Sequence, residues 1–279
     1  MALHKHICKI CHVFIDDCIG WSDSTKAHGL VVRKILDACR ANGLFLNPKK
    51  SVIITTSVTF LGHRIDQEGI HADTSKTGKI VQWLTPRSVK EVRPFLGLVR
   101  YLSAFLPSLV EYTAVLDPLT SKVYKSDFPE WTPVFQKAFD AIKKLVVSTD
   151  CLTFINHKNP GNNRIFITTD ASNVATGAVL SYGPTWDTAR PVAFDSKVLN
   201  QAERRYPVHE KEMLAIIWAL KKWHSDLLGM PFFVYTDHKT LQFFENQKDL
   251  LSSITMSMLS SLHNFIICFI NSYFLLHRL

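Results

Sequence analysis

Two apolar, strand-like runs of this chain each end at an aspartate, and an amphipathic helix that carries a glutamate lies between them. The first run ends at Asp170 and the second at Asp237, while Glu212 lies early in a helix expected at about 207–224. Strands separated by a helix favour a mixed α/β layer fold, in which acids that close neighbouring strands meet at one edge of the sheet. We therefore expect these three carboxylates to gather there.

Clustered carboxylates of this kind are typical of a metal centre. Carboxylate oxygens are ligands that Mg²⁺ prefers, and two ions about 3.5–4 Å apart clamp the attacking and leaving oxygens of a phosphodiester. Each acid taken singly is more typical of a surface residue that follows a strand. Together, in the order strand, helix, strand, they indicate a nuclease centre.

The composition is that of a globular protein: 47% of the residues are hydrophobic and 20% are charged. The net charge of +8 favours a polyanionic partner. Six scattered cysteines indicate a reduced protein and not a disulfide scaffold. The mixed charges of the first seventeen residues do not resemble a secretory signal. We expect an intracellular protein, cytoplasmic or nuclear, that is not secreted.

The first part of the chain predicts strands and one helix. A strand at 10–15 leads into Asp16 and Asp17. A helix is expected at about 25–42, with Val31, Ile35, Leu36 and Cys39 on its buried face and Gly43 at its end. Strands follow near 51–57 and 58–66, and a turn spans 66–69.

Helices dominate the middle of the chain. Ser88 and Glu91 have the spacing of a capping box, and Pro94 predicts a kink in the helix that follows. The apolar stripe of that helix is Val92, Phe95, Leu96, Val99 and Leu102. A second helix begins at Thr132-Pro133, and its inward-facing residues are Phe135, Ala138, Phe139, Ile142 and Leu145. A linker or turn spans 156–163. Strands follow at about 164–169, 175–182, 191–196 and 232–236.

Several motifs resemble the Pol polyproteins of gypsy-type LTR retrotransposons over residues 13–249. Those that resemble the RNase H domain are Asp170-Ala-Ser, Pro191-Val-Ala-Phe-Asp-Ser-Lys197, His209-Glu-Lys-Glu-Met-Leu-Ala-Ile-Ile-Trp-Ala-Leu220 and Tyr235-Thr-Asp-His238. Those that resemble the reverse transcriptase are Phe14-Ile-Asp-Asp17 of the palm, Phe60-Leu-Gly-His63 with Gly69-Ile70 of the strand pair that holds the primer end, and Lys90-Glu-Val-Arg-Pro-Phe-Leu-Gly-Leu98 of the thumb and connection.

The resemblance implies roles for the matching acids. Asp170 would bridge two Mg²⁺ ions (with Mn²⁺ as a substitute), Glu212 would hold one and Asp237 the other. Glu210 competes with Glu212, which we prefer because it directly precedes the Met-Leu-Ala-Ile run. The resemblance implies hydrolysis of the RNA strand of an RNA–DNA hybrid. It assigns Asp16 and Asp17 to the metal site of a polymerase palm, and His238 is expected to be structural.

Two departures from the family pattern bear on activity. The family's RNase H centre has a fourth acid near its C-terminal end, and no acid follows Asp249 here. The palm acids need a third carboxylate from an earlier strand. We therefore expect no polymerase activity from this chain, and either RNase H activity or, as the alternative, a catalytically degenerate remnant that binds nucleic acid.

Basic residues are concentrated in the middle of the chain. They could follow a nucleic-acid backbone or form an ordinary solvated helix face, and the resemblance favours the backbone. The candidates are Lys49, Lys50, Lys76, Lys79, Arg87, Lys90, Arg93 and Arg100.

Two other sequence features resemble functional motifs, but we expect neither to have the function that its motif would indicate. Cys8-Lys-Ile-Cys11-His12 has the spacing of a haem or zinc motif, but Cys11 and His12 fall on the expected strand, so metal binding is disfavoured. Residues 250–276 carry no Asp, Glu, Lys or Arg, and this length could cross a bilayer. Serine, histidine and asparagine lower the hydropathy of this segment, so we expect no membrane span.

The expected fold is thus α/β and α+β in several domains. A reverse transcriptase palm remnant occupies 1–75, a helical thumb and connection 76–127, an incomplete RNase H-like mixed sheet with helices 128–250, and a nonhomologous apolar tail 251–279. The RNase H-like sheet is expected to lack its last strand, which would leave one edge uncovered.

Overall fold

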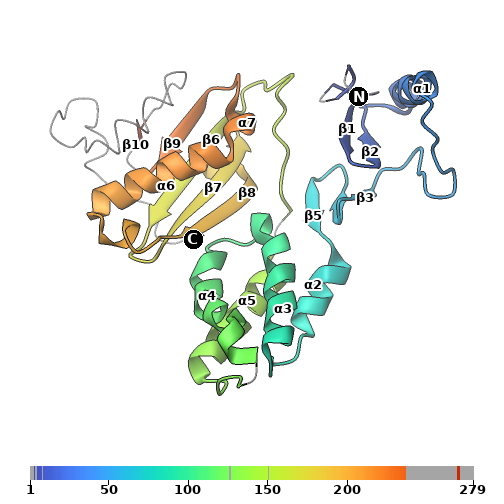
Figure 1. The fold of residues 1–279 in the computed structure, drawn as a ribbon. Helices are drawn as coiled ribbons and strands as arrows, with labels where there is room; N and C mark the ends of the chain where they lie inside the picture. The colour runs from blue at the N-terminus through green and yellow to red at the C-terminus, as the bar shows by residue number, and fades with distance from the viewer. Residues whose placement is uncertain are drawn as a thin grey trace. The chain divides into compact units, whose positions relative to one another are not determined.

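The computed structural model describes residues 3, 5–7, 9–125, 127–149, 151–236 and 269–270. The chain forms two compact units, Met1–Glu68 and Gly69–Leu279. Figure 1 shows their helices and strands. Asp237, His238 and most of the apolar tail lie outside the described residues.

The first unit begins with an antiparallel hairpin that packs against one helix. β1 (Cys11–Phe14) pairs with β2 (Asp17–Gly20), so Phe14 lies opposite Asp17. α1 (Thr25–Ala41) begins after Ser24, whose hydroxyl accepts a hydrogen bond from the Ala27 amide at 3.2 Å. Gly43 follows the helix with a φ of +66°, which confirms the predicted stop.

The helix α1 lies close to β2. A Cβ atom at Gly20 would lie 3.2 Å from Val31 and 3.1 Å from Ile35, so glycine permits this approach. Val31 and Cys39 are buried as expected, but Leu36 is 43% exposed, which corrects that prediction. The single small hairpin covers too little of α1 to bury its whole apolar face.

The second hairpin of this unit differs in part from the prediction. β3 (Val58–Phe60) and β4 (His63–Ile65) pair antiparallel through a turn at Leu61 and Gly62, which both have positive φ. The strand expected near 51–57 is wrong, because this segment pairs with no strand among the described residues and exposes its apolar side chains.

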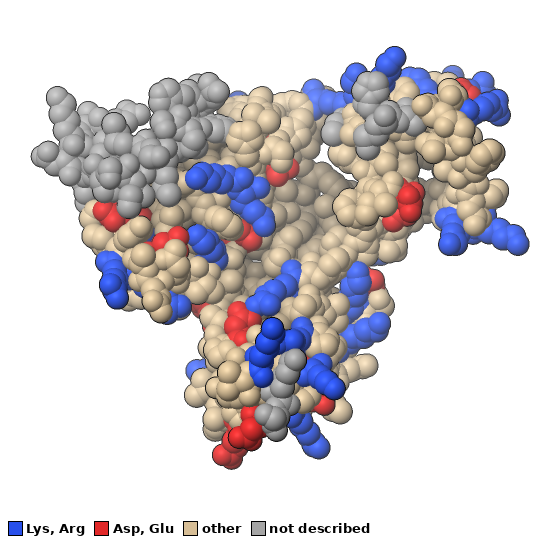
Figure 2. Space-filling model, viewed as in Figure 1, with Lys and Arg blue, Asp and Glu red and all other residues tan. Residues whose placement is uncertain are grey.

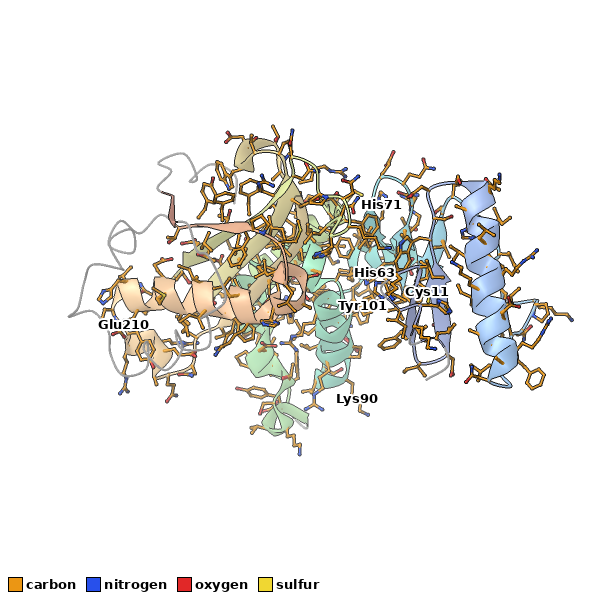
Figure 3. All side chains as sticks on the ribbon, turned by 90° about the horizontal axis from the view of Figure 1, so that it is seen from above. Cys11, His63, His71, Lys90, Tyr101 and Glu210 are labelled. Atoms are coloured by element: carbon orange, nitrogen blue, oxygen red, sulfur yellow. The ribbon has the colours of Figure 1, made fainter. Side chains whose placement is uncertain are left out.

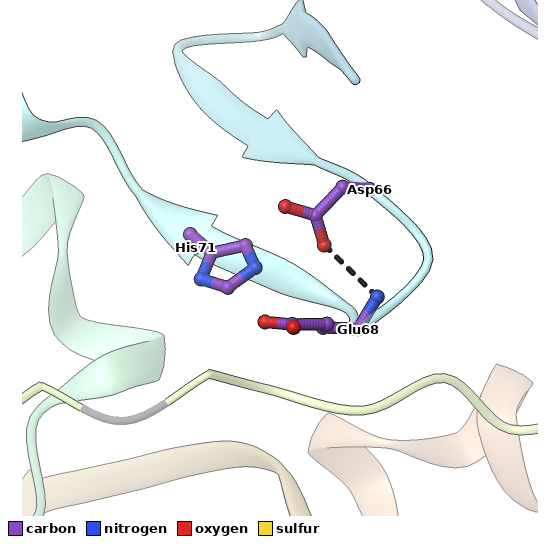
Figure 4. Close-up of side chains that lie close together, drawn as sticks. All are labelled: Asp66, Glu68 and His71. Atoms are coloured by element: carbon purple, nitrogen blue, oxygen red, sulfur yellow. Dashed lines mark hydrogen bonds between the residues drawn. The ribbon is translucent and has the colours of Figure 1, made fainter. Parts of the chain in front are cut away.

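The turn predicted at 66–69 is confirmed. The Asp66 carboxylate accepts the amide hydrogen of Glu68 at 2.9 Å (Figure 4) and pairs with Arg64 at 3.0 Å. Gly69 completes the turn with a φ of +146°. An aspartate that bonds the amide two residues on is a common way to start a turn.

The second unit begins with a helical bundle. Its elements are β5 (Ile70–Ala72), α2 (Thr74–Val81), α3 (Val89–Tyr101), the 3₁₀ turns η1 (Ser103–Phe105), η2 (Asp117–Thr120) and η3 (Lys122–Lys125), α4 (Leu109–Leu116) and α5 (Pro133–Val147). The predicted α3 stripe is fully buried, and the rings of Phe95 and Phe139 lie 4.7 Å apart at its centre. The helix α5 therefore shares the core of α2, α3 and α4. The boundary expected at residue 128 falls inside this helical core, so α5 does not begin the sheet domain.

One detail of α3 differs from the prediction. The helix continues through Pro94. Among the described residues Ser88 makes no side-chain capping bond, while the Glu91 carboxylate accepts the amide hydrogen of Arg87 at 2.8 Å. The acid still satisfies an amide at the start of the helix, one residue earlier than a capping box does.

The rest of the second unit is a mixed sheet with one long helix across a face (Figure 1). The strands are β6 (Arg164–Ala171), β7 (Ala175–Gly183), β8 (Arg190–Val198), β9 (Phe232–Tyr235) and β10 (Phe269–Ile270), with α6 (Val208–Lys222), the short α7 (His224–Leu227), η4 (Trp186–Thr188) and η5 (Glu203–Arg205). The order is β10-β9-β6-β7-β8. β9 is parallel to β6, and β10 is parallel to β9. β7 is antiparallel to β6.

The edge of β9 is covered, contrary to our expectation. The two residues of β10 pair with Val234 and Tyr235. The strand is very short, and it comes from the apolar segment that we expected to lie outside the domain. The sequence pattern did not predict it because two residues are too few to show a strand period.

The helix α6 packs on one face of the sheet. Ile165, Ile167 and Leu180 on that face form a core with Ile216 and Leu220 of the helix. Thr168 and Asp170 of β6 alternate to the opposite face, since successive strand residues point to opposite sides. α4 reaches that face at β8, where the Val110 amide donates to the Ser196 hydroxyl at 3.2 Å.

A polar network secures α6 and the segment before it to β8. Trp218 donates its indole hydrogen to Asp195 at 2.7 Å, and Lys222 lies 3.5 Å from the same carboxylate. Lys197 pairs with Glu203 at 3.0 Å. The sequence did not predict these contacts, because the partners are far apart in the chain or lie in an irregular loop.

The carboxyl of Glu203 is buried within this network. Burial alone would raise its pKa, but the Asn200 amide at 2.7 Å and the Lys197 ammonium outweigh that effect, so the pKa lies below its ordinary value. A carboxyl with a lowered pKa in the folded state stabilises the fold above its unfolded pKa and loses that contribution as the pH falls.

None of the helices in the described part of the chain is long and apolar enough to cross a membrane. The apolar segment 250–276 lies outside the described residues except for β10.

Glu203→Gln should lower the free energy of unfolding by about 1–2 kcal/mol at pH 7, since a buried charge-assisted network is removed. The difference from the wild type should persist above about pH 5 and shrink below about pH 4, as the wild-type carboxyl protonates. Urea unfolding at both pH values measures this, with the exposed Glu130→Gln as control. An undiminished difference in acid would contradict the lowered pKa.

Candidate functional site

Asp170 lies at the end of the central strand of the sheet. Residues 165–169 of β6 are buried, whereas Asp170 is exposed. An apolar strand thus delivers one carboxylate to the surface at the sheet edge.

Glu212 lies in α6 and reaches the same place. The side chain is only 3% exposed, and its Oε1 atom accepts the amide hydrogen of Ala171 at 3.2 Å. Ala171 directly follows Asp170, so the hydrogen bond holds the Glu212 carboxylate beside the end of β6. The structure therefore places the Glu212 carboxylate beside the backbone that directly follows Asp170.

Glu210, the competing acid, lies at the first turn of α6 and is half-buried (Figure 3). Residues 210 and 212 are two apart, so they point to different sides of a helix. Glu212 is the acid that bonds to the end of β6. This geometry agrees with our preference for Glu212.

Asp237 lies outside the described residues, but the strand before it is described. β9 is parallel to β6, with Thr168 opposite Tyr235. Asp170 and Asp237 each follow the paired residue of their strand by two positions. The pairing therefore brings the ends of β6 and β9 to the same edge of the sheet.

A pocket lies beside Asp170. Its walls are the start of α4, with Ser108, Val110 and Glu111, and the open face of the sheet, with Thr168, Gly177 and Ser196. Apolar side chains, among them Val179 and Phe194, complete the lining. The pocket is therefore of mixed polar and apolar character, with hydroxyl-bearing residues and the carboxyl groups of Asp170 and Glu111 among its walls.

The predicted palm acids lie on the first hairpin. Asp16 is in the turn between β1 and β2, Asp17 begins β2, and both are exposed. Among the described residues no third possible ligand of the Asp, Glu, His or Cys types joins them in a compact group. Phe14, the first residue of the motif that contains these acids, is 53% exposed.

The basic residues separate into two kinds. Arg93 donates to the Thr120 carbonyl at 2.7 Å, Arg100 pairs with Asp117, and Lys76 lies 3.8 Å above the ring of Tyr101. These contacts hold α3 to its neighbours. Lys79, Arg87 and Lys90 are exposed on or next to α2 and α3, where Lys and Arg side chains gather in Figure 2.

Lys49 and Lys50 lie in the first unit, in an exposed segment. They therefore cannot be assigned to the same surface as the basic residues of α2 and α3. Cys11 lies on β1 as predicted and is buried (Figure 3). Cys8 of the zinc-like motif lies outside the described residues.

Two family models match the chain. Residues 161–265 match the RNase H-like domain found in reverse transcriptase, and residues 2–65 match reverse transcriptase (RNA-dependent DNA polymerase). The first match runs past Leu250, where we expected the resemblance to end. Enzymes of these two families use divalent metal ions.

Curated relatives are polyproteins of transposons. The chain is 36% identical over 250 residues to the retrovirus-related Pol polyprotein from transposon opus of Drosophila melanogaster, covering 86% of this chain and 24% of the relative. It is 34% identical over 230 residues to the Tf2-3 polyprotein of Schizosaccharomyces pombe, covering 82% and 17%. The chain thus spans about a quarter or less of the length of these relatives.

Solved structures share the fold. The foamy viral protease-reverse transcriptase in complex with RNA/DNA hybrid aligns with a TM-score of 0.79 at 24% identity, covering 98% of this chain and 37% of that one. The same viral protein in complex with dsDNA aligns with a TM-score of 0.77 at 23% identity, covering 98% and 56%.

The motifs, the family models and the relatives agree, and the gypsy type that we expected is consistent with them. The chain therefore belongs to the Pol polyproteins of retrotransposons, of which it carries reverse transcriptase sequence followed by an RNase H-like domain.

Proposed function

We propose that the RNase H-like domain hydrolyses the RNA strand of RNA–DNA hybrids with Mg²⁺, for which Mn²⁺ can substitute. The observation that supports this proposal is the hydrogen bond from the Ala171 amide to Glu212, which holds that carboxylate next to the residue that follows Asp170 at the end of β6. Asp170, Glu212 and Asp237 would hold the metal.

The donor set fits a hard divalent cation. Carboxylate oxygens are the ligands that Mg²⁺ prefers, and Mg²⁺ is commonly held by few of them together with water and substrate phosphate. Two divalent ions at such a site supply the positive charge that stabilises the attacking and leaving oxygens of a phosphodiester. Asp170 is exposed to a substrate, whereas Glu212 is held in one orientation by its bond to Ala171.

A nucleic-acid duplex is the partner that the surface supports. The pocket beside Asp170 presents the hydroxyls of Ser108, Thr168 and Ser196, which can donate to phosphate or sugar oxygens. Hybrids are recognised largely through shape and 2′-hydroxyl contacts in the minor groove. The viral protein of similar fold has been solved with an RNA/DNA hybrid, which supports the same class of substrate here.

We assign no polymerase activity to this chain. Asp16 and Asp17 lie at the turn between β1 and β2, and within the described part of the first unit no further acid joins them in a compact group.

The second candidate function is binding of nucleic acid without cleavage. The exposed Lys79, Arg87 and Lys90 favour it, because basic side chains without an internal role can neutralise phosphates. The two candidates differ in whether bound hybrid is cut.

The purified chain should cut a labelled RNA–DNA hybrid in Mg²⁺ or Mn²⁺, and Asp170→Asn or Glu212→Gln should each lower the rate more than about 100-fold. Mutation of a residue that only supports a metal ligand lowers activity or metal affinity by up to about 100-fold, so loss of a ligand itself should lower the rate further. Glu210→Gln is the matched control and should stay within about threefold of wild type. Cleavage that persists in Asp170→Asn would contradict the assignment, and absence of cleavage in wild type would favour the binding function.

Hybrid binding should weaken with salt, and Lys79→Gln with Lys90→Gln should reduce the slope of log K against log salt. The expected reduction is about 0.9 for each phosphate that the variant no longer neutralises, the value for a B-form duplex. Lys137→Gln with Lys144→Gln, two exposed lysines of α5, removes the same charge elsewhere. Equal slopes for the two double variants would show that α2 and α3 do not contact the backbone.

A further inference from the structure

A buried lysine adjoins the candidate metal centre. Lys211 is only 6% exposed, and its ammonium donates to Oδ1 of Asn173 at 3.1 Å. Lysine is among the residues that are rarely buried, because the charged amine must leave water. A lysine in this position calls for a specific role.

Asn173 lies in the turn that follows Asp170. Ser172 orders this turn, because its hydroxyl oxygen accepts the amide hydrogens of Val174 at 3.2 Å and Ala175 at 2.9 Å. The Val174 carbonyl accepts the Leu199 amide at 2.8 Å, which ties the turn to the end of β8. These bonds order the turn internally and toward the end of β8, but none of them reaches α6.

Two consecutive residues of α6 thus contact the segment just after Asp170. Glu212 contacts the Ala171 amide, and Lys211 contacts the Asn173 side chain. Two bonds from one helix to two points of one turn restrain both the distance and the rotation of the turn relative to the helix. One bond is to the backbone at Ala171 and the other is to the side chain of Asn173.

We propose that Lys211 is a positioning residue, which acts through Asn173 to set the spacing between the carboxylates of Asp170 and Glu212. The proposal rests on the proposed function, in that these two acids are taken to hold a divalent cation. Metal sites tolerate only small errors in ligand position, so a loosened turn lowers affinity. Lys211 itself touches neither the cation nor the substrate.

The sign of the effect separates positioning from simple electrostatics. A lysine that acted only through its charge would repel a divalent cation, so its removal would strengthen metal binding. A lysine that positions the turn does the reverse: its removal weakens metal binding. The Asn173→Ala variant should then have the same effect, although it removes no charge.

The experiment is a Mn²⁺ titration of the purified chain, followed by calorimetry, with thermal unfolding measured in parallel. Lys211→Met and Asn173→Ala should each weaken Mn²⁺ binding about tenfold, the lower range for partners of metal ligands. The double variant should be no weaker than either single variant, because both break the same hydrogen bond. Asn173→Asp, which keeps an acceptor for Lys211, should bind Mn²⁺ at least as tightly as wild type.

Matched controls are Lys221→Met, an exposed lysine of the same helix, and Asn159→Ala, an exposed asparagine of another turn. Asn173 is exposed, so its alanine variant should fold even if Lys211→Met does not. Unchanged or tighter Mn²⁺ binding in Asn173→Ala, or effects that multiply in the double variant, would overturn the proposal.

Asp170→Asn separates this inference from the proposed function. If Asp170→Asn leaves Mn²⁺ binding unchanged, the metal centre is wrongly assigned and both proposals fail. If Asp170→Asn abolishes binding while Lys211→Met and Asn173→Ala do not alter it, the positioning role alone fails.

Discussion

A single hydrogen bond joins the two elements on which the candidate site depends. The Ala171 amide donates to the carboxylate of Glu212, which connects the end of β6 to the first turns of α6. A buried carboxylate is costly unless it is hydrogen-bonded or paired. The hydrogen bond can form only when α6 lies at one position along the length of β6, so it offsets part of that cost only in this packing. Because the apolar residues of both elements already favour that packing, fold stability and placement of the acids agree.

The sheet and its helix could largely be predicted from the sequence, because their apolar periods are long and regular. β6, β7, β8 and β9 lie close to the predicted runs, and the stripe of α3 is buried residue for residue. The failures concern features that depend on partners distant in the chain. The apolar segment near 51–57 has no strand partner among the described residues, and α5 packs with α2 to α4 although it precedes the sheet.

The candidate site could be predicted only as a set of acids. The motifs indicated Asp170 and Glu212, but the contacts that orient them involve irregular turns. Asn173 could not be identified, since nothing local relates it to α6. Lys211 lies four and eight residues before Ala215 and Ala219 on α6, and the structure buries both alanines. Residues at this spacing share a helix face, so the inward direction of Lys211 follows from that burial and could not be predicted from the spacing alone.

The central claim of the proposed function is that the end of β6 and the start of α6 together form a divalent-metal site. A crystal structure of the chain grown with Mn²⁺ and measured at the manganese absorption edge tests it most directly. We expect an anomalous peak within about 2–2.3 Å of carboxylate oxygens of Asp170 and Glu212, close to the distance for Mg²⁺. Crystals of Asp170→Asn should lack that peak. Well-ordered wild-type carboxylates with no peak beside them would contradict the claim.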